Sequence, residues 1–242
     1  MYRTMMLAAG VVAAISGHVM AFEVDSEAVK ALEAKITEAY KADRAMVVTS
    51  EVSIELGGQK DQESVTTRFG ADGAKEIVTP NFDVVALDGY FYMTIRGVDD
   101  FYLRRPLGDG VAKTMSDVFM TADVVPWVIS LRGGDPPASW ISQMTFGLFP
   151  EATVTGVSTA TREVDGVPMD VDVLELTSAR GAGALEVSSE TGLIQTLKAA
   201  VSSPNGPAEI QATLNVTVET KTMESLKPAI AFEAGELKMV ES

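Results

Sequence analysis

Hydrophobic residues recur with two different periods along this chain, and the change of period marks its elements. After Ser26 the apolar positions lie three or four residues apart, which predicts an amphipathic helix that Ser26 can cap. These positions are Val29, Leu32, Ile36 and Tyr40. The opposite face of the helix is charged, so we expect its apolar stripe to lie against the rest of the domain.

From Met46 onward, apolar and polar side chains alternate, which is the period of a half-buried strand. Asp88-Gly89 between two apolar runs is a strong hairpin signal. A slip in the alternation at Val173-Leu174 predicts a β-bulge. The predicted strands cover 46–56, 63–69, 75–79, 82–87, 90–95, 101–103, 152–163, 167–177, 182–188, 193–202 and 208–220, with a last one near 229–233 or 236–240.

The segment from 107 to 150 has neither a strand period nor one long helix. Its apolar clusters predict three short helices, around Met115–Phe119, 126–131 and 138–145. A sheet of ten or eleven antiparallel strands must curl, close or split. We therefore expect a mainly β domain with a few helices. Its sheet would be a strongly curved, incomplete β-barrel, with the helices packed against the concave side.

The N-terminal residues have the layout of a cleavable signal peptide. Arg3 is followed by an uncharged apolar run, Met5 to Ile15, and Val19-Met20-Ala21 offers small or aliphatic residues before a cleavage site. The run is about half of the ~20 residues that span a membrane. We therefore predict export to the periplasm, cleavage after Ala21, and one domain over 22–242.

Cleavage would leave a mature chain with neither histidine nor cysteine, because His18 is the one histidine and there is no cysteine. This composition excludes Ser-His-Asp and Cys-His catalysis, zinc sites built on those residues, and disulfides. Without Arg3 the formal charge is −16, from 18 basic and 34 acidic residues, which disfavours nucleic acid as a partner. Asp170 and Asp172 are expected on the solvated face of their strand. We predict no enzyme activity, no metal and no cofactor.

Four short motifs resemble the LolA/LolB-type fold of lipoprotein-localisation factors, and most closely the LolA-like periplasmic proteins of unassigned function. They are Asp88–Met93 with Phe101-Tyr102 behind it, Val125–Leu131 with Gly133-Gly134-Asp135, Ser189–Ile194, and Phe232–Gly235. The resemblance implies an incomplete barrel covered by a helical lid, with a hydrophobic cavity that holds acyl chains of lipids or lipoproteins. LolB-type proteins are lipid-anchored through a cysteine, so the match is to the soluble type.

Bulky apolar side chains of the predicted lid and its neighbouring strands are the candidates for lining that cavity. They are Tyr92, Phe101, Phe119, Met120, Trp127, Leu131, Trp140, Met144, Phe146 and Phe149. Pockets for apolar ligands have such linings, although the same residues can simply fill a core.

Arginines near the lid are candidates for a phosphate or carboxylate head group: Arg96, Arg104, Arg105 and Arg132. The alternative for them is ordinary surface pairing with nearby aspartates.

Two functions follow. The first is a soluble, monomeric carrier for an apolar small molecule, lipid or acylated protein, with a possible membrane-associated partner protein. The second is a protein-interaction or sensor module of the same fold with no ligand cavity.

Overall fold

A computed structural model describes residues 26–41, 45–70, 74–98, 100–121, 125–145, 147–164, 167–202 and 209–221, together with 232, 234 and 237–241. The predicted signal peptide and Phe146 lie outside this part of the chain. The first described element is the helix α2 (Ser26–Ala39), which begins and ends close to the predicted positions. No helix among the described residues is long and apolar enough to cross a membrane.

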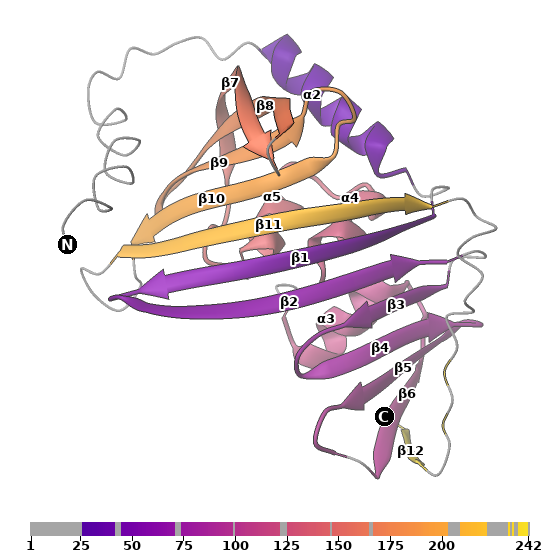
Figure 1. Ribbon diagram of the computed structural model, residues 1–242. Helices are drawn as coiled ribbons and strands as arrows, with labels where there is room; N and C mark the ends of the chain where they lie inside the picture. Colours follow the sequence, from indigo (N-terminus) through magenta and orange to yellow (C-terminus); the bar gives the residue numbers. More distant parts are fainter. Residues whose placement is uncertain are drawn as a thin grey trace.

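Within these described residues, twelve strands form one sheet in the order β12-β6-β5-β4-β3-β2-β1-β11-β10-β9-β8-β7 (Figure 1). All neighbours are antiparallel except β12, which runs parallel to β6. The sheet is strongly curved and does not close, so the predicted mainly β, incomplete-barrel architecture is confirmed. The strands are β1 (Ala45–Leu56), β2 (Gln59–Phe69), β3 (Lys75–Val78), β4 (Phe82–Leu87), β5 (Tyr90–Ile95), β6 (Phe101–Pro106), β7 (Thr153–Val164), β8 (Val167–Ser178), β9 (Gly181–Ser188), β10 (Ile194–Ser202), β11 (Glu209–Lys221) and β12 (Lys238–Glu241).

Three short helices lie together on one side of the sheet: α3 (Val111–Phe119), α4 (Trp127–Gly133) and α5 (Pro137–Met144) (Figure 1). All three were predicted from the sequence. The register places Leu214 opposite Val52 and Val52 opposite Glu63, so these side chains share the sheet face that the helices cover. The apolar core lies between that face and the helices.

Helix α2 is fixed to the turn between β9 and β10 by polar contacts as well as by its apolar stripe. Lys35 Nζ donates to Asp172 Oδ2 at 3.1 Å and to the carbonyl of Ser189. The turn can approach because Gly192 has φ of +75°, and a Cβ there would lie 2.8 Å from the Lys35 carbonyl oxygen. The Ser189–Ile194 motif is therefore the docking site for the N-terminal helix.

Two sequence expectations in β8 are wrong. Residues 171–178 pair with β9 without a break, and the irregularity lies between Val154 and Gly156 in β7. The slip in the apolar pattern arises because both faces of β8 carry buried residues, Val171 on one and Leu174 on the other, each 1% exposed. Asp172 lies two residues from Leu174 on that residue's face, so it binds Lys35 rather than facing solvent.

Candidate functional site: an apolar pocket beneath the helices

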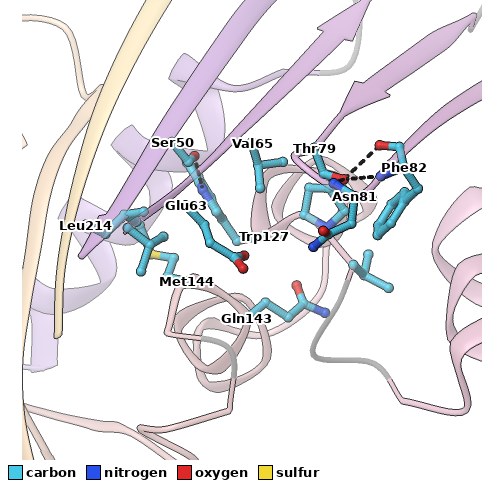
Figure 2. Close-up of a pocket in the computed structure, with 13 residues that line it drawn as sticks. Ser50, Glu63, Val65, Thr79, Asn81, Phe82, Trp127, Gln143, Met144 and Leu214 are labelled. Atoms are coloured by element: carbon cyan, nitrogen blue, oxygen red, sulfur yellow. Dashed lines mark hydrogen bonds between the residues drawn. The ribbon is translucent and has the colours of Figure 1, made fainter. Parts of the chain in front are cut away.

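A pocket of about 180 Å³ lies between the concave face of the sheet and helices α4 and α5 (Figure 2). Five separate segments of the chain line it: β1 with β2, the β3–β4 turn, the entry to α4, α5, and β11. The lining residues are Ser50, Val52, Glu63, Val65, Thr79, Asn81, Phe82, Val125, Pro126, Trp127, Gln143, Met144 and Leu214. The site is therefore formed only when the lid helices pack on the sheet.

Trp127 forms one wall of the pocket and is held in a single orientation. Its indole is 3% exposed, and Nε1 donates a hydrogen bond of 2.9 Å to Ser50 Oγ. Ser50 lies on the inward face of β1 because it alternates with Val48 and Val52, which are also buried. A buried indole N–H needs an acceptor, and Ser50 supplies it. This contact fixes the start of α4 against the centre of the sheet.

The polar side chains of the pocket gather at one side of it. Gln143 is 8% exposed, and its Oε1 is buried without a hydrogen-bond partner. Figure 2 shows Glu63, from β2, with its carboxylate directed into the space between the sheet and α5. Thr79 Oγ1 is engaged in its own turn, where it donates to the carbonyl of Phe82 at 2.7 Å. Polar side chains without a hydrogen bond to another lining group are therefore those of Gln143, Glu63 and Asn81.

The size of the pocket limits what it holds in this conformation. Small-molecule sites usually measure about 300–1,000 Å³, whereas an apolar cavity of about 150 Å³ accepts benzene. At about 180 Å³ the pocket fits an apolar group of roughly six to eight carbon atoms. Within the part of the chain that is described, no cluster of His, Cys, Asp and Glu side chains has the arrangement of a metal site.

Of the ten apolar candidates from the sequence, Trp127 and Met144 line the pocket. Leu131, Trp140 and Phe149 are buried in the surrounding core at 5%, 2% and 0% exposure. Phe149 packs so tightly on β9 that a Cβ at position 183 would lie 3.3 Å from its ring. These three side chains belong to the core and are not among the residues that line the pocket.

The other described candidates lie away from the pocket. Phe119 packs on Phe82, a lining residue, with ring centroids 4.8 Å apart. Tyr92 stacks on Phe232 at 4.5 Å. Phe101 is 43% exposed and Met120 is 92% exposed. Met120 ends α3 with φ of 58°, which directs the chain out of the helix and leaves the side chain in solvent.

The four candidate arginines do not converge on one site. Arg96 pairs with Asp83 at 3.2 Å, and the guanidinium of Arg104 lies 3.7 Å from the centroid of the Tyr90 ring. Arg105 lies on β6, opposite Phe91 of β5. None of the four is among the residues that line the pocket.

Arg132 has a different environment, on the covered face of the sheet. Its guanidinium lies 4.1 Å from the centroid of the Phe69 ring, and Lys75 is the cross-strand neighbour of Phe69. Burial, and then the positive charge of Arg132, lowers the pKa of Lys75.

Eleven of the thirteen lining residues were not among the candidates from the sequence, and five of these are polar: Ser50, Glu63, Thr79, Asn81 and Gln143. Glu63 could have been found, because it shares the inward face of its strand with Val65, Thr67 and Phe69. Gln143 follows Trp140 by three residues, which places it on the apolar face of α5. The signal in both cases is a polar residue in line with apolar residues on one face, although Glu63 itself is exposed.

Comparison with known proteins gives similarity at the level of fold. No family model matches the chain, and no curated protein matches it either. A DUF1329 family protein from Desulfovibrio piger is 16% identical, with a TM-score of 0.31 over 82% of this chain and 99% of that one. MucB is 15% identical, with a TM-score of 0.38 over 85% of this chain, which spans 64% of the MucB chain. A LolA superfamily protein from Nitrosomonas europaea is 10% identical, with a TM-score of 0.29 over 80% of this chain and 93% of that one. The likeness to LolA-type proteins expected from the motifs is thus found among the structural neighbours, and it concerns the fold alone.

Proposed function

We propose that this protein binds an apolar molecule in the pocket beneath α4 and α5, holds it without covalent chemistry and releases it unchanged. The observation that carries the proposal is a preformed cavity of about 180 Å³ whose walls are mainly Val, Leu, Met, Phe and Trp side chains. Burying apolar ligand surface in such a cavity is favourable by about 25 cal/mol per Å². The binding energy would come from that burial, with a few polar groups to set orientation.

An acyl chain longer than the pocket has a path for its remaining length. Beyond Val52, the inward face of β1 continues with Ile54, which is half-buried, and Leu56, which is 43% exposed. These residues extend the apolar surface from the pocket toward the end of the strand. We therefore propose a lipid or acyl chain as the ligand, with its end in the pocket and the rest along β1. The predicted periplasmic location, cleavage after Ala21 and action as a monomer belong to this proposal.

The competing function is a protein-interaction module in which the core has no ligand role. The tight burial of both tryptophans, at 3% and 2%, favours it. The pocket favours the carrier, since side chains from five segments surround a space of about 180 Å³.

Native mass spectrometry of the protein purified from its own host separates the two functions. A carrier should retain a co-purifying lipid, or take up an octyl or longer acyl probe after delipidation. An interaction module should give a clean apo mass and take up no probe. The Val65→Phe variant, which fills the pocket from β2, is the control for uptake at other surfaces.

A further inference from the structure

The charge of the pocket is one-sided. Among its thirteen lining residues the one charged side chain is Glu63, and none is lysine or arginine. Glu63 is exposed and lies directly across from Val52, so its carboxylate borders the apolar part of the pocket on the side that meets solvent. An anionic head group placed here would meet a negative charge with no lining cation to offset it.

Gln143 supplies a second acceptor from the opposite wall. Its side chain is more than nine-tenths buried, and Oε1 has no hydrogen-bond partner. Helix α5 fixes the position of Gln143, because Met144 next to it and Trp140, one helical turn before it, are buried at 1% and 2% exposure. Figure 2 shows the Gln143 amide and the Glu63 carboxylate facing the same space from α5 and β2. A buried acceptor left unpaired is costly, so a ligand that donates to it gains affinity.

Two of the other polar lining side chains already take part in hydrogen bonds. Ser50 Oγ accepts from Trp127, and Thr79 Oγ1 accepts from the backbone N–H groups of Asn81 and Phe82. Gln143 Oε1 and the Glu63 carboxylate therefore offer acceptors beside a negative charge, and the Asn81 amide lies in the same lining. An alkylammonium group has three donors and one positive charge, which matches this arrangement.

We infer that the pocket selects apolar amines, with the chain among Val52, Val65 and Trp127 and the ammonium between the Glu63 carboxylate and Gln143 Oε1. This inference rests on the proposed function and names its ligand class. Under this inference, the pocket does not bind the head group of a free fatty acid or of a phosphate-containing lipid.

The test uses three probes with one chain: octylamine, octan-1-ol and octanoate, titrated calorimetrically into the full mature protein near neutral pH. Octylamine should bind roughly tenfold more tightly than octan-1-ol, the effect of one charge-assisted hydrogen bond, and octanoate should bind most weakly. Glu63→Gln keeps the shape of the side chain and removes its charge. It should bring octylamine to within about twofold of octan-1-ol.

Glu51→Gln is the matched control. Glu51 is exposed on the other face of β1, next to Val52, and its substitution removes the same unit of net charge as Glu63→Gln. It should leave the preference for octylamine intact. Equal binding of all three probes, or an equal loss of preference in both variants, would overturn the inference while leaving apolar binding in place. If none of the three probes binds, the proposed function fails, and the ligand class fails with it.

Discussion

Tyr40 and Trp127 meet edge to face, with ring centroids 5.5 Å apart and an interplanar angle of 71°. Each ring is also tied to a different strand by one hydrogen bond. The hydroxyl of Tyr40 accepts from the Ile194 N–H at 3.2 Å, and the indole of Trp127 donates to Ser50 at 2.9 Å. This pair joins α2, β10, α4 and β1 in one buried contact. The N-terminal helix therefore stabilises the wall of the pocket without lining it.

Replacing Tyr40 with phenylalanine should weaken this contact. The ring remains, but the buried Ile194 N–H loses its acceptor, which costs about 1–3 kcal/mol of unfolding free energy. Urea unfolding of the mature protein measures the change. Tyr102→Phe is the control, since that ring takes part in an outer aromatic stack with Phe232 and should lose about 0.5 kcal/mol or less. Equal losses in the two variants would contradict the role given to the Tyr40 hydroxyl.

The burial of Tyr40 also predicts how stability depends on alkaline pH. Desolvation raises the pKa of Tyr40 well above its usual value, and the hydrogen bond from Ile194 offsets this only in part. Because the folded pKa exceeds the unfolded one, the stabilising contribution is complete below about pH 10 and is lost as the pH rises above it. The unfolding free energy should therefore fall more steeply above pH 10 for the native protein than for Tyr40→Phe. Parallel curves for the two proteins would show that Tyr40 is accessible when folded.

Filling the pocket should abolish binding while the fold survives. Val65→Phe places a ring in the space between β2 and Trp127, and we expect uptake of octan-1-ol to fall at least ~10-fold. Thr66→Phe adds the same ring one residue further along, on the opposite face of the strand, and should leave uptake unchanged. Calorimetric titration compares the two, and circular dichroism verifies that both fold. A pocket variant that binds as well as the native protein would place the binding site elsewhere.

Gln143→Leu should affect the stability of the apo protein and its affinity for ligand in opposite directions. Removing an unpaired buried oxygen should raise the unfolding free energy of the apo protein by about 1 kcal/mol, whereas binding of octan-1-ol and octylamine should weaken severalfold. Gln211→Leu on the exposed face of β11 is the control and should change stability by less than about 0.5 kcal/mol. A loss of stability in Gln143→Leu would show that the amide already has a partner in the apo state.

The elements of this fold could be predicted because local periodicity determines them. The alternation in β1 and β11 and the apolar spacing in α2 each follow from one strand or one helix having a single covered face. The slip at Val173-Leu174 was misinterpreted because β8 is buried on both faces, which depends on its neighbours in three dimensions. Strand alternation alone could not place Asp172 beside Lys35, because Lys35 lies on α2, far from β8 in the sequence.

The pocket itself could be predicted only in part. The sequence identified Trp127 and Met144 as lining residues, since both belong to apolar lid helices. It did not distinguish them from Trp140 or Phe149, which are equally apolar but fill the core. A shift of about one carbon atom's width decides whether a side chain lines a cavity or fills it. That shift depends on how five segments of the chain pack together, which the local sequence does not determine.

The most direct test of the account is a crystal structure of the protein with 8-bromooctan-1-ol, in which the anomalous signal of bromine locates the end of the chain. The bromine should lie inside the pocket, in contact with Val52, Val65 or Trp127, with the hydroxyl toward Gln143. A bromine peak on the outer surface, or a pocket closed by its own side chains, would contradict a binding site beneath the helices.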